Sequence, residues 1–134
     1  MTSRQRIAVA VLVLAGVFAA VVLVAVAARA CPGATALQLC PDAARNRIVV
    51  LALASLTMAL FVTPFAFLGE FVARRRIVYR GAWWRAARRG ALAGIVLASL
   101  GALRLGAALT VPIAIFTIVL AVLAERFLAV RDRT

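Results

Sequence analysis

The side chains of this chain that could do chemistry are few: two cysteines and four carboxylates, with no histidine. Cys31 and Cys40 are each followed by proline, in a segment between two long apolar runs. In an oxidising compartment the two thiols can form a disulfide. Such a bond would close a short loop and stabilise the fold by about 2–3 kcal/mol. We therefore predict a Cys31–Cys40 disulfide that acts as a structural staple.

Other uses of the two cysteines lack the groups they need. A four-helix membrane enzyme that passes electrons from a loop disulfide to a quinone needs a second cysteine pair, and this chain has only two cysteines. A tetrahedral metal site would be half empty, because two thiolates without histidine supply only two of four ligands. We accordingly expect no metal and no cofactor.

The carboxylates Glu70 and Glu125 stand at the ends of apolar runs, not within them. Charge inside a membrane marks functional sites by default, but charge at a helix end is typical of an interfacial ion pair. Arg74 lies one helical turn after Glu70, and Arg126 follows Glu125 directly, so we expect these pairs. With no acid in mid-membrane, no proton relay is expected, and the absence of any nucleophile–base pair argues against an enzyme.

The overall composition excludes a soluble globular domain. Hydrophobic residues make up 66% of the 134 residues and charged residues 15%, with a net charge of +12. A soluble domain is roughly half apolar and a quarter charged. The arginines punctuate long apolar runs, and this pattern favours a membrane protein over a nucleic-acid-binding one. We expect no nucleic-acid partner.

Four apolar runs predict four transmembrane helices, since a helix needs about 20 apolar residues to cross a bilayer core of about 30 Å. The last two runs are joined near Arg104, where Thr110 is suited to cap the fourth helix and Pro112 to its first turn. A re-entrant hairpin is the alternative for these two. The predicted fold is a single all-α membrane domain over 1–134, an up-down bundle of two hairpins. Its helices are expected at 7–28, 48–70, 86–107 and 110–130.

The arginines predict the orientation of the bundle. With a cytoplasmic N-terminus, twelve of the 16 arginines lie on the cytoplasmic side. The other four are three arginines of the outer loop 29–47 and Arg104. Because cytoplasmic segments are enriched in arginine, both termini are expected in the cytoplasm. All basic residues are arginine and alanine is abundant, which is typical of a GC-rich prokaryotic genome. We therefore expect the protein in the inner (cytoplasmic) membrane of a prokaryote. Residues 1–30 also resemble a signal peptide, but the apolar run is longer than usual, which favours an uncleaved anchor.

The segment 73–90 combines arginine with tryptophan and is predicted to be a cytoplasmic loop along the membrane surface. Tryptophan favours the membrane interface, and arginine near an anionic surface binds lipid headgroups. The arginines could serve topology alone, or they could bind anionic lipid. The candidate headgroup-binding residues are Arg74, Arg75, Arg76, Arg80, Arg85, Arg88, Arg89, Trp83 and Trp84.

Small residues recur every four positions along the third predicted helix. This row, which we call the small-residue row, consists of Gly90, Gly94, Ala98, Ala102 and Gly106. Small residues let helix backbones approach closely in lipid. The row is expected to pack within the chain, against the second or fourth helix, and a homodimer contact is the alternative.

Pro64 interrupts the hydrogen bonding of the second predicted helix, because it has no N–H to donate. A kink is expected there. The hydroxyl of Thr63 is expected to compensate the carbonyl that Pro64 leaves without its usual donor.

These observations together predict a small membrane protein that works by binding. The leading hypothesis is a non-catalytic accessory or scaffold subunit, either a homo-oligomer or part of a larger complex, that binds partner helices and anionic lipid. The alternative is a small oligomeric channel or transporter with Arg104 in an anion path.

The topology is testable with a reporter fused to the C-terminus. A fluorescent protein that matures only in the cytoplasm should fluoresce, and a phosphatase that is active only outside should be inactive. The opposite pair of results would overturn the predicted orientation.

Overall fold

The computed structural model describes residues 2–29, 43–73 and 82–132, and these form four α-helices. They are α1 (Ser3–Arg29), α2 (Ala43–Ala73), α3 (Ala82–Leu105) and α4 (Val111–Arg131). Each helix is long and apolar enough to cross a bilayer. The prediction of an all-helical fold with four helices of membrane-spanning length and composition is thereby confirmed. Cys31 and Cys40, with their predicted disulfide, lie outside the described residues.

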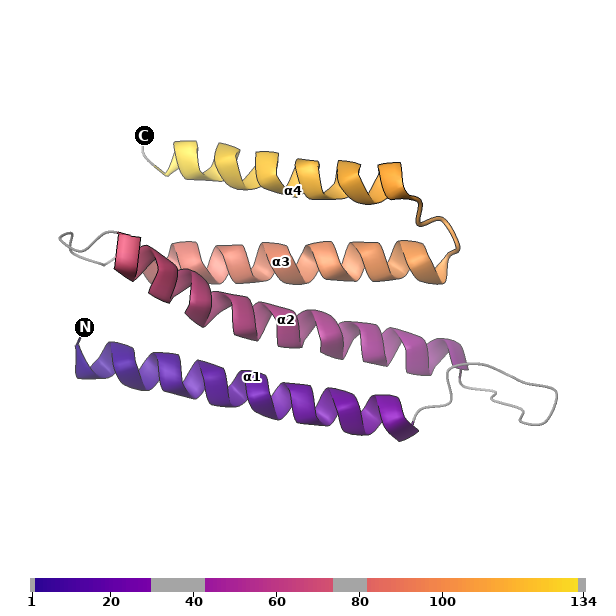
Figure 1. Cartoon of the computed structure of the whole chain (residues 1–134), viewed down its shortest axis with the longest axis horizontal. Coiled ribbons are helices and arrows are strands. Elements are labelled where there is room, and N and C mark those ends of the chain that lie inside the picture. Colours follow the sequence, from indigo (N-terminus) through magenta and orange to yellow (C-terminus); the bar gives the residue numbers. More distant parts are fainter. Residues whose placement is uncertain (1, 30–42, 74–81, 133–134) are drawn as a thin grey trace.

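The helices lie side by side in the order of the chain, and each runs opposite to the one before it (Figure 1). α2 and α3 share the most extensive contact, α1 packs on α2, and α4 touches α3 over a smaller area. Within the described residues α1 and α4 do not meet. The arrangement is therefore an open row, whereas a four-helix bundle packs its helices around a shared core.

The two ends of the row differ in what they bring together (Figure 1). At one end, which we call the termini end, lie the start of α1, the end of α2, the start of α3 and the end of α4. At the other end, which we call the far end, lie the end of α1, the start of α2 and the turn between α3 and α4.

Helix α3 begins earlier than the apolar pattern predicts. It starts at Ala82, so residues 82–90, expected within the cytoplasmic loop, form its first turns. Its C-terminus is closed by Ala107, which has a left-handed φ of 55°. Thr110 then takes the extended N-cap conformation before α4, although its side chain makes no capping bond, and Pro112 lies in the first turn as expected.

Two glycines of the small-residue row set the contact between α2 and α3. A Cβ on Gly90 would lie 2.7 Å from the carbonyl oxygen of Ala59, and one on Gly94 would lie 2.9 Å from that of Ser55. Both glycines are buried, so these α3 positions lie against α2. Further along the row, Ala98 is half-buried, while Ala102 and Gly106 are exposed. Towards the far end the contact moves to Gly101, which faces the side chain of Leu51.

The hydroxyl of Thr63 does not compensate Pro64 in the expected way. It donates to the carbonyl oxygen of Ala59 at 2.7 Å, whereas the carbonyl that Pro64 leaves without its helical donor is that of Leu60. The Thr63–Ala59 bond lies at the point where Gly90 approaches α2. A side chain at position 90 would therefore meet both the hydroxyl and the backbone.

Replacing Gly90 with alanine should destabilise the protein by about 1–3 kcal/mol, because a Cβ cannot fit against the Ala59 carbonyl without moving a backbone. Gly69→Ala is the matched control, since a Cβ there meets nothing within 4 Å. It should leave stability unchanged or raise it by up to about 1 kcal/mol through helix propensity. Thermal unfolding in detergent measures both. Equal stability of the two variants would contradict the close α2–α3 approach.

Candidate functional site

Arginines in the first turns of α3 bind carboxylates on both neighbouring helices at the termini end. On the α2 side, Nε and Nη2 of Arg85 each lie 2.9 Å from Oε1 of Glu70. The Glu70 side chain is only 6% exposed. A charged carboxylate buried to this degree would be costly without a counter-charge, and Arg85 supplies one.

Two further ion pairs connect α3 to the end of α4. Nη1 of Arg88 lies 2.5 Å from Oδ2 of Asp132, and Nε of Arg89 lies 2.5 Å from Oε1 of Glu125. The Arg88 side chain is 12% exposed, and its Nε and Nη2 are buried without a hydrogen-bond partner. The Arg89–Glu125 pair is more open, with each side chain more than a third exposed. α3 thus binds α2 and α4 through the same arginine-rich end.

One of these carboxylates has a different partner from the one that local spacing predicts. Glu125 was expected to pair with its neighbour Arg126, but it pairs with Arg89 from another helix. For Glu70 the expected partner, Arg74, lies outside the described residues. No local pattern could reveal Arg85, Arg88 and Arg89 as partners, because the pairs join residues 15, 44 and 36 positions apart.

The residues proposed for lipid headgroups therefore fall into three groups. Three of them, Arg85, Arg88 and Arg89, are engaged by carboxylates. Four of them, Arg74, Arg75, Arg76 and Arg80, lie outside the described residues. The tryptophans divide: the ring of Trp83 stacks on buried Phe67 at 4.1 Å between centroids, whereas Trp84 is 72% exposed. Trp84 is thus the tryptophan available to the membrane interface.

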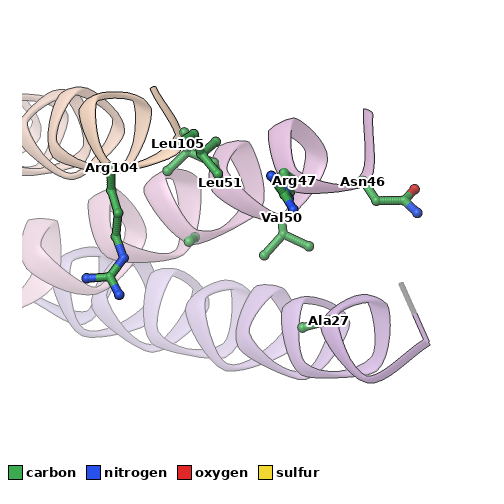
Figure 2. Close-up of a pocket in the computed structure, with 9 residues that line it drawn as sticks. Ala27, Asn46, Arg47, Val50, Leu51, Arg104 and Leu105 are labelled. Carbon is green, nitrogen blue, oxygen red and sulfur yellow. The ribbon is translucent and has the colours of Figure 1, made fainter. Parts of the chain in front are cut away.

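A cationic hollow lies between α1, α2 and α3 at the far end, and we call it the far-end crevice (Figure 2). Its volume is about 490 Å³. Arg104 and Val50 extend from α3 and α2 towards the side on which α1 lies, with Ala27 on α1 below them. The residues that line it are Ala27, Asn46, Arg47, Val50, Leu51, Ala54, Gly101, Arg104 and Leu105.

An apolar groove of about 510 Å³ lies between α2, α3 and α4. Met58, Val96 and Ile118 contribute to its wall, and its two charged residues are Arg89 and Glu125, which pair with each other. A groove of this composition can hold an apolar side chain or an acyl chain. Its carboxylate, Glu125, is engaged by Arg89.

The described residues contain no group of three histidine, cysteine or carboxylate side chains that could hold a metal ion. No family model matches the chain, and comparisons with curated proteins and with solved structures found no significant similarity. The function must therefore be argued from the ion pairs, the exposed helix faces and the hollows described above.

The three ion pairs should differ in their contribution to stability because they differ in burial. Glu70→Gln removes the charge of a buried carboxylate beside Arg85 and should cost about 1–3 kcal/mol. Glu125→Gln is the same change in a half-exposed pair and should cost about 0–1 kcal/mol. Chemical or thermal unfolding in detergent measures both. A cost for Glu125→Gln as large as that for Glu70→Gln would show that burial does not set the strength of these pairs.

Proposed function

We propose that this chain is a non-catalytic scaffold subunit of a prokaryotic inner membrane that assembles with a second copy of itself through α4. The observation that supports this proposal is the open row. α4 packs on one neighbour only, and none of its residues is buried. An outer helix with a whole face unused can bind another helix in the membrane without disturbing the rest of the row.

The two faces of α4 differ in side-chain size. Half-buried small residues, Ala114, Thr117, Ala121 and Ala124, recur at helical spacing, as expected for the face towards α3. The exposed side carries large apolar residues at the same spacing, namely Phe116, Leu120, Leu123, Phe127 and Val130. This second set is uncharged over its length, so two copies in the same orientation can pack it face to face. A two-fold contact of this kind is the commonest way for identical subunits to assemble.

The proposed orientation places the termini end in the cytoplasm, with both termini inside. Seven described arginines lie at that end and four at the far end, and cytoplasmic segments favour arginine. Arg4, Arg6 and Arg126 are exposed there, and their side chains bind no carboxylate in the described part of the chain. They are better placed than the engaged α3 arginines to attract anionic headgroups.

Photo-crosslinking in native membranes tests the α4 contact. A photoreactive amino acid in place of Leu123, on the large-residue face of α4, should give a crosslinked species of twice the monomer mass. The same amino acid in place of Phe65, which is exposed on α2, is the matched control and should give little of it.

Three outcomes would contradict the proposal. Adducts with lipid alone from position 123 would mean that the α4 face is covered by the bilayer. A discrete adduct with a different protein would identify a hetero-complex in place of the homodimer. Equal dimer yields from positions 65 and 123 would indicate random collision.

A further inference from the structure

The far-end crevice has the composition of a binding site for an anionic amphiphile. Arg47 and Arg104 contribute positive charge to its lining, and Asn46 adds an amide. The other lining residues are apolar: Ala27, Val50, Leu51, Ala54, Gly101 and Leu105. We propose that the crevice binds an anionic phospholipid, with the phosphate at Arg104 and the upper part of an acyl chain along α2. This inference goes beyond the proposed scaffold function, which concerns α4 and the termini end.

The charge balance of the far end favours an anion. All three described carboxylates, Glu70, Glu125 and Asp132, are in ion pairs at the termini end. The described far end contains Arg29, Arg45, Arg47 and Arg104 but no carboxylate, and Asp42 lies outside the described residues.

Arg104 is the residue best placed to bind the phosphate. It is exposed, it lies one position before the end of α3, and its side chain points towards α1 (Figure 2). Its guanidinium makes no hydrogen bond or ion pair among the described residues, so all its N–H donors remain for a ligand. Arg47 and Asn46 each have an interaction within the chain as well, so they contribute charge and polarity but are not the free donors. A guanidinium matches the geometry of two phosphate oxygens.

The position and length of the crevice fit a lipid better than a free anion. Arg104, Ala27 and Arg47 all lie within about two turns of a helix end, which is the depth of lipid phosphates if the helices span the bilayer. From Asn46 to Ala54 the lining follows α2 for about 12 Å, at 1.5 Å per residue. The part of that wall formed by Val50, Leu51 and Ala54 is apolar, and a small anion such as phosphate would leave it uncovered. A lipid would place its phosphate at Arg104 and its hydrocarbon against Val50, Leu51 and Ala54.

The test is photo-labelling of the full-length protein in nanodiscs with a lipid that carries a diazirine near the top of one acyl chain. Nanodiscs of phosphatidylglycerol and of phosphatidylcholine are compared, each containing the probe with the matching headgroup, and labelled peptides are mapped by mass spectrometry. Phosphatidylglycerol should label the peptide that contains Val50, Leu51 and Ala54 in excess over phosphatidylcholine. Arg104→Gln should reduce this labelling about fivefold, as expected for the loss of one arginine–headgroup interaction.

Arg29→Gln is the matched control, because Arg29 lies at the same end but is not a lining residue of the crevice. It lines a neighbouring hollow with Val22, Ala25 and Val26, which shares Asn46 with the crevice. This variant should leave labelling of the α2 peptide nearly unchanged. Thermal unfolding of both variants checks the fold, and Arg104→Gln should retain it because the side chain is exposed and unpaired in the described structure.

Several results would overturn the proposal. One is equal labelling of the α2 peptide by the two headgroups. Another is unchanged labelling of the α2 peptide in Arg104→Gln. A loss of labelling in Arg29→Gln equal to that in Arg104→Gln would show that general surface charge, not the crevice, attracts the lipid. Abolition of labelling by millimolar inorganic phosphate would show that the guanidinium binds free phosphate in preference to lipid.

Discussion

The close approach of α2 and α3 is the constraint on which the rest of the row depends. It requires glycine at positions 90 and 94, because a Cβ there would meet the backbone of α2. With the two helices this close, Trp83 stacks on Phe67 and Arg85 reaches Glu70. Lipid is as apolar as the helices, so no hydrophobic force drives them together, and dispersion contacts and polar bonds must supply the association. The close approach at Gly90 and Gly94 allows dispersion contacts and polar bonds to form between the same two helices.

A consequence of this packing is that the charges separate along the helices. α3 carries its arginines at the start, where α2 and α4 both end with a carboxylate within reach. Every described acidic residue is neutralised there. The far end keeps its four described arginines without a described acid. Ion pairing therefore engages three arginines of α3 at the termini end, whereas at the far end Arg104 makes no ion pair among the described residues, and Arg45 and Arg47 have other interactions.

Sequence alone was sufficient for the helices and insufficient for their partners. Apolar runs of about 20 residues predict four helices because a bilayer imposes that length. The third helix was expected from residue 86, four residues after its start at Ala82, because the first residues of α3 are rich in arginine and tryptophan and the apolar pattern cannot separate a polar first turn from a loop. Spacing identified Gly90 and Gly94 as packing residues, but not the α2 residues that they meet. The ion pairs and the far-end crevice depend on which helix faces meet, and local periodicity carries no information about that.

The attachment of α4 differs in kind from that of α2. The α2–α3 contact combines buried glycines, a stacked aromatic pair and a buried carboxylate. α4 contacts α3 over a smaller area, with ion pairs at one end, of which Arg89–Glu125 is more than one-third exposed on both sides. Exposed pairs contribute about 0–1 kcal/mol each. α4 is thus the helix that can separate from the row at the lowest cost. α4 also has the most exposed large apolar residues of the four helices. A partner helix could therefore bind to α4 with the least disturbance to the α2–α3 contact.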